Sequence, residues 1–132
     1  MTGEVDLDVL LPDRRCAVTR THTGGLLTVH PVDVATERHR YGYLQPVASA
    51  PQVPLDEIGV VLVPGALFDR YGHRLGHGAG YYDRLLPRLP AGVPMVGVVP
   101  VALVVDDLPV EPHDVTMTHL ATEAGVWPVA SR

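Results

Sequence analysis

The chain has 132 residues, of which 46% are hydrophobic and 19% charged, a balance typical of one packed globular domain rather than a disordered segment. Its formal net charge is -5 and all 10 of its basic residues are arginine, which argues against a sequence-independent nucleic-acid binder. The single cysteine, Cys16, permits no internal disulfide, and no apolar run reaches membrane-spanning length. We therefore expect a single cytoplasmic domain over residues 1–132, a monomer with small-molecule partners and no nucleic-acid or membrane partner.

The first regular elements are expected near the N-terminus. Residues 16–21 and 26–30 alternate in character on either side of a Thr-Gly-Gly turn, which predicts two strands joined as a hairpin. The stretch VASAPQVP, residues 47–54, contains prolines that exclude a regular helix or a central strand. It predicts a connecting segment.

A strand, a glycine-rich loop, a helix and a second strand are expected next. The valine-rich runs IGVVLVPG, residues 58–65, and PMVGVVP, residues 94–100, are typical of strands buried on both faces of a sheet. Between them a helix is expected to begin at about Gly80 and to be stopped by two prolines. A last strand is expected over MTHLATEAGV, ending near Gly125. The order predicts an α/β fold, a three-layer domain around a mainly parallel sheet with an antiparallel hairpin near the N-terminus.

The glycine-rich stretch GHRLGHGAGYYDRLL begins at Gly72 and follows a strand, at the sheet edge where open parallel sheets bind ligands. Glycines at 76, 78 and 80 leave no Cβ to hold a phosphate away from the backbone N–H groups, and the next helix would add a partial positive charge. A Walker loop is excluded because the chain has no lysine, and the order G-x-G-x-G is not a dinucleotide fingerprint. The local pattern leaves two readings open, an anion site and an ordinary surface loop.

The longer stretch LVPGALFDRYGHRLGHGAGYYDRLL, residues 62–86, resembles the signature of the 5-formyltetrahydrofolate cyclo-ligases, also called methenyltetrahydrofolate synthetases. Residues 108–126 are similar to the closing segment of that family, and GEVDL and YGYLQP are weaker echoes. The resemblance spans nearly the whole chain. It implies an enzyme of folate one-carbon metabolism that uses ATP and Mg²⁺ to convert 5-formyltetrahydrofolate into 5,10-methenyltetrahydrofolate. The formyl oxygen would be phosphorylated, after which the neighbouring amine nitrogen closes the ring and phosphate leaves.

The resemblance also implies site residues. Arg74 and Tyr81 would be catalytic, and Asp83 and Asp114 would bind Mg²⁺, a hard ion that prefers carboxylate oxygens. The implied contacts of the nucleotide are Arg74, Leu75, Gly76, His77, Gly78, Ala79, Gly80, Tyr81 and Tyr82, and those of the folate are Glu4, Tyr41, His77, Gly78, Ala79, Gly80 and Tyr81.

Structural roles compete with these assignments. Asp83 could interact favourably with the positive end of the helix dipole, and Tyr81 could be an aromatic residue of the core. The spacing of the histidines at 22, 30, 39 and 119 argues against a zinc site. Family members usually begin with a helix whose Lys and Arg residues hold the ATP phosphates, and this chain starts after that helix. We therefore expect folate binding with slow turnover. The alternatives are a catalytically impaired homologue that binds folate or nucleotide, and a related nucleotide-binding enzyme for another small heterocycle.

Overall fold

The computed structural model describes residues 16–76 and 80–131 of the chain. Its strands are β1 Ala17–His22, β2 Leu26–Pro31, β3 Thr36–Arg38, β4 Leu44–Pro46, β5 Val61–Pro64, β6 Leu67–Asp69, β7 Arg74–Leu75, β8 Met95–Val98, β9 Val104–Val105, β10 His119–Thr122 and β11 Gly125–Pro128. The helix α1 Tyr81–Leu85 continues into the 3-10 turn η3 Leu86–Arg88, and two further 3-10 turns are η2 Leu55–Glu57 and η4 Val101–Leu103.

The central sheet has the strand order β11-β10-β8-β5. Its pairs β5–β8 and β8–β10 are parallel, whereas β10 and β11 form an antiparallel pair at one side. The two valine-rich runs are thus neighbours in a parallel sheet, with Val63 opposite Gly97. The predicted strand–helix–strand unit and the mainly parallel sheet are confirmed.

The main core lies against this sheet. Its buried members include Val63, Phe68 and Leu120, each with a relative exposure of 0%. Gly97 in β8 makes room for Phe68, because a Cβ at Gly97 would lie 2.5 Å from the Phe68 ring. A glycine is therefore required here by close packing, although it lies within a strand.

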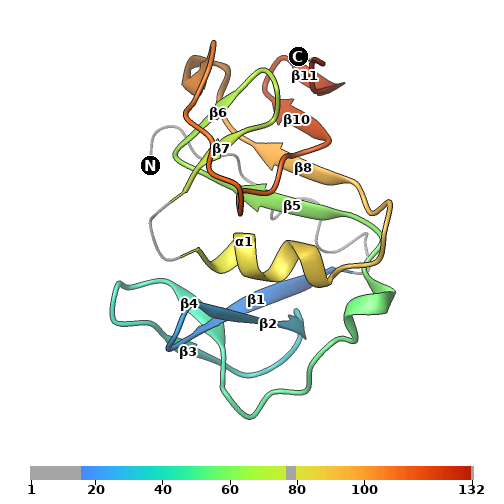
Figure 1. Cartoon of the computed structure of the whole chain (residues 1–132). Coiled ribbons are helices and arrows are strands. Elements are labelled where there is room, and N and C mark those ends of the chain that lie inside the picture. Colours follow the sequence, from blue (N-terminus) through green and yellow to red (C-terminus); the bar gives the residue numbers. More distant parts are fainter. Residues whose placement is uncertain (1–15, 77–79, 132) are drawn as a thin grey trace.

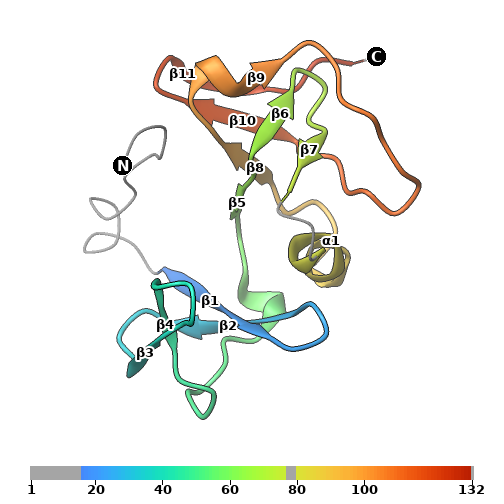
Figure 2. The same cartoon turned by 90° about the vertical axis from the view of Figure 1, so that its left-hand side faces the viewer.

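A second, smaller core joins α1 to the N-terminal hairpin. Strands β1 and β2 pair antiparallel, which confirms the predicted hairpin, and Leu27 and Val29 of β2 pack with Leu85 of α1. In both views the helix lies between the central sheet and the β1–β2 hairpin, so the molecule has three layers (Figures 1 and 2). The short β3–β4 hairpin lies beside β1.

Two sequence predictions were too simple. The expected last strand is two strands, because Thr122 Oγ1 accepts a hydrogen bond of 3.0 Å from the Ala124 N–H and turns the chain. Gly125, with a φ of 135°, then begins β11. The segment between β5 and α1 is also more than a glycine loop, because it contains the β6–β7 hairpin. The helix, expected to begin at about Gly80, starts at Tyr81, with Gly80 at its N-cap in the left-handed conformation at a φ of 70°.

None of the helices in the described part of the chain is long and apolar enough to cross a membrane.

Candidate active site

Arg74 connects β7 to the first turn of α1. Its Nη2 lies 3.5 Å from Asp83 Oδ1, its Nη1 donates to the Pro64 carbonyl at 3.3 Å, and its guanidinium carbon lies 5.6 Å from the centre of the Tyr82 ring. The Nε atom of Arg74 is buried and has no hydrogen-bond partner among the described residues. An arginine at the carboxyl end of β5 is thus held in a fixed place with a donor still unused, which suits an anionic ligand.

The glycines beside Arg74 are needed for close approach. A Cβ at Gly76 would lie 2.7 Å from Arg74 Nη1, so the guanidinium rests on bare backbone. The residues His77, Gly78 and Ala79 of the implied loop lie outside the described residues, as does Glu4. Leu75 is exposed. The helix that follows has five residues, so its dipole adds less positive charge than a longer helix would.

Tyr82 is largely shielded by the hairpin. Burial raises the pKa of its hydroxyl above the usual value, although the hydrogen bond with Thr19 and the charge of Arg74 act in the opposite direction. Its ring packs with both hydrophobic clusters. Tyr82 therefore serves as a packing residue under Arg74 as well as an implied nucleotide contact.

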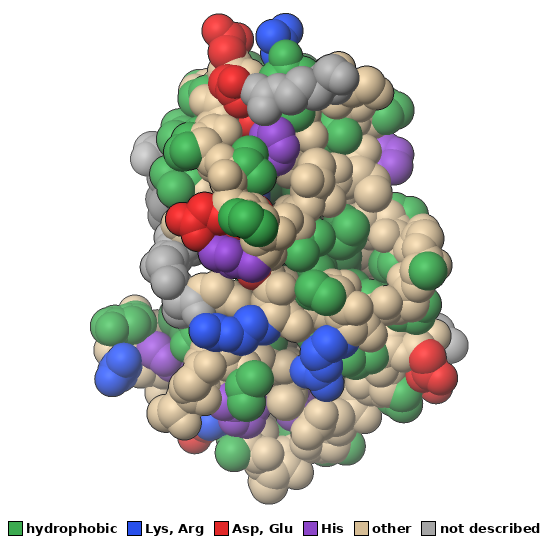
Figure 3. Space-filling model, viewed as in Figure 1, with side chains coloured by type: hydrophobic (Ala, Val, Ile, Leu, Met, Phe, Trp, Pro, Cys, Tyr) green, Lys and Arg blue, Asp and Glu red, His purple; other side chains and the backbone are tan. Residues whose placement is uncertain are grey.

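Asp114 lies in a separate turn after β9. Its Oδ2 accepts a hydrogen bond of 2.8 Å from the Glu111 N–H, and Oδ1 lies 3.5 Å from His113 Nε2. The side chains of Asp83 and Asp114 have relative exposures of 24% and 28%, so solvent reaches both carboxylates. Figure 3 shows acidic and histidine side chains above a hollow in this face of the molecule, with arginines below it. Each predicted metal ligand has its own protein partner, and their sharing of one ion stays a prediction.

On the other side of α1, Tyr81 lines an open hollow of about 610 Å³. The remaining walls come from the two N-terminal hairpins and are formed by Arg20, Thr21, His22, Thr23, Gly24, His39, Arg40 and Gln45. The side chains in this hollow are mainly cationic, imidazole and aromatic. They are chemically suited to a flat, aromatic ligand that carries negative charge.

Tyr41 stands at the rim of the same region. It is 75% exposed, its ring centre lies 5.0 Å from that of His39, and the Arg40 guanidinium carbon lies 5.0 Å above its ring. His39 and Arg40 line the hollow together with Tyr81, whereas Tyr41 is not among its lining residues. That Tyr41 and Tyr81 contact one substrate therefore stays a prediction.

Sequence reasoning missed the polar side chains of the hairpins. Arg20 donates to Glu37 and, at 2.9 Å, to the Pro46 carbonyl, while Gln45 Oε1 accepts from the Thr21 N–H and hydroxyl at 3.1 and 3.0 Å. These bonds fasten β4 to β1. The alternation of side chains along a strand could have indicated these polar residues, because it places Arg20 and His22 on one face of β1.

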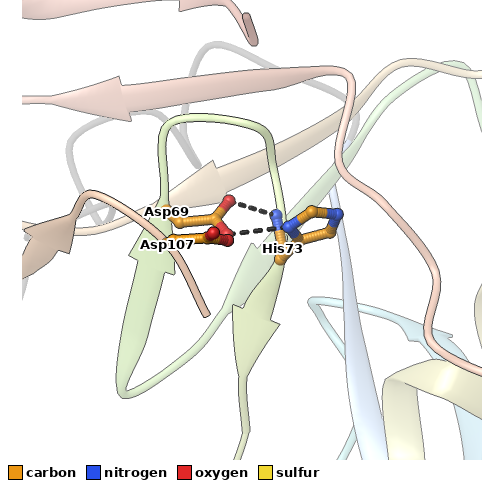
Figure 4. Close-up of side chains that lie close together, drawn as sticks. All are labelled: Asp69, His73 and Asp107. Atoms are coloured by element: carbon orange, nitrogen blue, oxygen red, sulfur yellow. Dashed lines mark hydrogen bonds and ion pairs between the residues drawn. The ribbon is translucent and has the colours of Figure 1, made fainter. Parts of the chain in front are cut away.

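A cluster of Asp69, His73 and Asp107 was missed as well (Figure 4). Each of these side chains offers one metal-ligand atom, and the three atoms lie within 4.8 Å of one another. Asp69, however, is completely buried and already accepts four bonds, from His73 Nδ1 at 2.7 Å and from the N–H groups of Tyr71, His73 and Leu108 at 3.0, 2.9 and 2.9 Å.

These contacts determine the charge state of Asp69. Burial by itself raises the pKa of this carboxyl, but the hydrogen bonds from the His73 backbone and side chain, and then from Leu108, lower the pKa below its usual value. An ionised carboxylate with all its lone pairs engaged holds the β6–β7 turn against the segment after β9. Its role is structural, and it keeps Arg74 of β7 in place.

Comparison with known proteins gives one consistent result. The model of the 5-formyltetrahydrofolate cyclo-ligase family matches residues 4–123. The curated 5-formyltetrahydrofolate cyclo-ligase of Mycolicibacterium smegmatis is 47% identical over 75 residues, which are 54% of this chain and 39% of that protein. The Escherichia coli enzyme of the same name is 37% identical over 76 residues, 57% of this chain and 42% of that protein. The matched parts thus span about two fifths of these relatives.

Solved structures agree in fold. The NMR structure of 5,10-methenyltetrahydrofolate synthetase from Aquifex aeolicus is 30% identical with a TM-score of 0.77, and the match covers 98% of this chain and 68% of that one. The synthetase of Mycoplasma pneumoniae, 21% identical with a TM-score of 0.62, shares the fold over 85% of this chain and 57% of that one. Since the family model covers far more than half of the sequence, the chain belongs to the 5-formyltetrahydrofolate cyclo-ligase family.

Proposed function

We propose that this chain takes part in the ATP- and Mg²⁺-dependent conversion of 5-formyltetrahydrofolate into 5,10-methenyltetrahydrofolate. The observation that carries the proposal is the first turn of α1. Consecutive helical residues are about 100° apart around the axis, so Tyr81 and Asp83 emerge on opposite sides. Tyr81 faces the aromatic and cationic hollow, while Asp83 meets Arg74 beside the glycine loop. One turn of helix thus borders a folate site and a phosphate site.

The hollow beside Tyr81 suits a folate. The pterin and benzoyl rings are flat and aromatic, which favours stacking on Tyr81 and Tyr41, and the glutamate tail is anionic, which favours Arg40 at the rim. The volume of about 610 Å³ is within the range of sites for ligands of this size.

On the other side, Arg74 and the backbone at Gly76 and Gly80 would hold the phosphates of ATP. The buried, unpartnered Nε of Arg74 fits an anion at this place, and the absence of a Cβ at Gly76 lets the guanidinium lie close to the loop. Asp83 and Asp114 offer the carboxylates that Mg²⁺ requires. ATP supplies the phosphoryl group that turns the formyl oxygen into a leaving group, and Mg²⁺ offsets the phosphate charge. The chain supplies the position and the charge.

A second candidate is a homologue that binds folate or nucleotide with little turnover. It is favoured by the state of Arg74, whose side chain is 7% exposed and already contacts Asp83 and the Pro64 carbonyl. A guanidinium so engaged must break a contact before it grips a phosphate. This candidate predicts ligand binding without product.

One assay separates the two. Formation of 5,10-methenyltetrahydrofolate is followed by its absorbance, with and without ATP and Mg²⁺, in parallel with a binding titration of 5-formyltetrahydrofolate. We expect ATP-dependent product in the parent chain and at least a tenfold lower rate in Arg74→Gln, since charge on a transferring phosphate contributes about 10²-fold or more. Arg88→Gln, at an exposed position in η3, is the matched control. Binding of the folate without any product supports the second candidate, and neither binding nor product rejects both.

A further inference from the structure

A chain of hydrogen bonds crosses the β1–β2 hairpin and ends at the hollow. His22 Nε2 lies 2.7 Å from Thr28 Oγ1, and the same oxygen lies 2.7 Å from His30 Nε2. The other ring nitrogen of His30, Nδ1, lies 2.9 Å from the Pro51 carbonyl. His22, Thr28 and His30 lie on the same face of the hairpin, because Arg20, two residues before His22, is the strand partner of Thr28.

The donor and acceptor of each bond can be assigned by starting from the last one, between His30 and the Pro51 carbonyl. A carbonyl oxygen can only accept, so His30 Nδ1 carries a proton and donates it to Pro51. His30 is 1% exposed and has no carboxylate partner among the described residues, and a buried charge without a partner is unfavourable. A neutral His30 therefore accepts at Nε2.

The single hydroxyl proton of Thr28 is then used to donate to His30. Thr28 Oγ1 must accept from His22, whose Nε2 carries the proton. The other nitrogen of His22, Nδ1, is left unprotonated in the neutral ring, and it has no hydrogen-bond partner within residues 16–76 and 80–131. His22 is thus held in one tautomer with a basic nitrogen available.

The surroundings keep this imidazole neutral. Burial lowers the pKa of His22 below its usual value of 6.5, and the nearby charge of Arg20 lowers it further. His22 lines the same hollow as Tyr81, together with the titratable or charged groups His39, Arg40 and Arg20. Among the described residues, no acidic side chain lines that hollow, although Glu37 of β3 pairs with Arg20 beside it.

We propose that His22 Nδ1 accepts the proton that the folate amine nitrogen loses when it closes onto the formyl carbon. This inference rests on the proposed function. In the ring closure a bond forms between the amine nitrogen (N10) and the activated formyl carbon, the N10–H bond breaks, and its proton passes to His22 Nδ1. The carbon–oxygen bond to the phosphorylated oxygen breaks, and phosphate leaves with the electron pair. Thr28 and His30 act as positioning residues that fix the tautomer.

The first experiment measures the tautomers and needs no turnover. Long-range ¹H–¹⁵N NMR spectra of the chain labelled at histidine, recorded at neutral pH, report which ring nitrogen carries the proton. We expect His22 with the proton on Nε2 and His30 with the proton on Nδ1, and a shift of the His22 Nδ1 signal on addition of 5-formyltetrahydrofolate. In Thr28→Val, His22 should become a mixture of tautomers. A His22 ring that carries its proton on Nδ1 in the parent chain overturns the proposal.

The second experiment measures the rate of 5,10-methenyltetrahydrofolate formation against pH. In His22→Gln the amide still donates to Thr28 but offers no base, so kcat should fall by roughly 10²-fold with little change in KM, and the acid limb of the pH profile should disappear. Thr28→Val should lower kcat by less, and His119→Gln in β10 should behave as the parent. A kcat for His22→Gln within about twofold of the parent, or an unchanged acid limb, overturns the proposal.

The two arms separate this inference from the proposed function. If the parent chain makes no product, the proposed function and the proton transfer both fail, and the NMR arm still reports whether the tautomer assignment holds. If the parent turns over but His22→Gln turns over equally well, only the role of His22 fails.

Discussion

Replacement of Asp69 by asparagine tests the structural role of the buried cluster. The two oxygens of Asp69 divide four donors between them: Oδ1 accepts from the backbone N–H groups of Tyr71 and His73, and Oδ2 accepts from Leu108 and from the His73 ring. An asparagine amide has one oxygen and one NH2 group. Whichever way the amide is turned, its NH2 group points at two groups that donated to the carboxylate oxygen it replaces.

At least one buried backbone N–H then loses its acceptor, and the His73 ring can adapt only by changing tautomer. An unsatisfied buried donor costs about 1–3 kcal/mol, and the remaining bonds are weaker because they no longer end on a charge. We therefore expect Asp69→Asn to lower the free energy of unfolding by about 3 kcal/mol and the Tm by roughly 10 °C.

The pH dependence follows from the direction of the pKa shift. The pKa of Asp69 in the folded chain lies below its ordinary value of 3.8, so its stabilising effect is complete above that value and is lost as the pH falls through the lower folded pKa. The stability difference between the parent and Asp69→Asn should thus be constant around neutral pH and narrow only below about 3.8.

Urea denaturation followed by circular dichroism over this pH range measures the difference, with Asp56→Asn at an exposed position of η2 as control. A loss of less than about 1 kcal/mol at neutral pH, or a difference that does not narrow in acid, would refute the assignment of Asp69 as an ionised anchor.

Three further predictions concern the packing and the phosphate side of the site. Gly97→Ala should lower the free energy of unfolding by about 1–3 kcal/mol in urea melts, because the new Cβ would lie 2.5 Å from the Phe68 ring. Gly59→Ala, whose Cβ would meet open space, should leave the stability unchanged. Equal stability of the two variants would contradict the packing argument. Gly78→Val should weaken ATP binding in calorimetric titrations by restricting the backbone of the loop, and unchanged affinity would remove the loop from the nucleotide site. Asp83→Asn and Asp114→Asn should each raise the Mg²⁺ concentration needed for half-maximal activity while the melting curve stays close to that of the parent, and an unchanged Mg²⁺ dependence in both would rule out these ligands.

The elements that could be predicted from the sequence are those with a strong local cause. The valine runs of β5 and β8 pair in the parallel sheet as predicted, although β5 is not buried on both faces as expected, since Val63 is buried but Leu62 is 40% exposed. The Thr-Gly-Gly turn leaves few alternatives to a hairpin. The break between β10 and β11 depends instead on one side-chain bond from Thr122 to the Ala124 N–H. A threonine in a strand-like run gives no sign of such a bond until the backbone has already turned.

The phosphate side and the folate side of the candidate site also differ in how far they could be predicted from the sequence. Arg74, Gly76, Gly80 and Asp83 lie within ten positions of one another, so the sequence shows them as one motif. The hollow beside Tyr81 is assembled from β1, the β3–β4 hairpin and α1, which approach one another only because Leu27 and Val29 pack on Leu85. No local pattern records that contact. His22 could therefore be read from the sequence only as a histidine in a strand, and its chemistry depends on Thr28, on His30 and on a carbonyl at Pro51. The proton acceptor proposed here is a property of the folded hairpin, and the same histidine in an isolated β1 peptide would have no fixed tautomer.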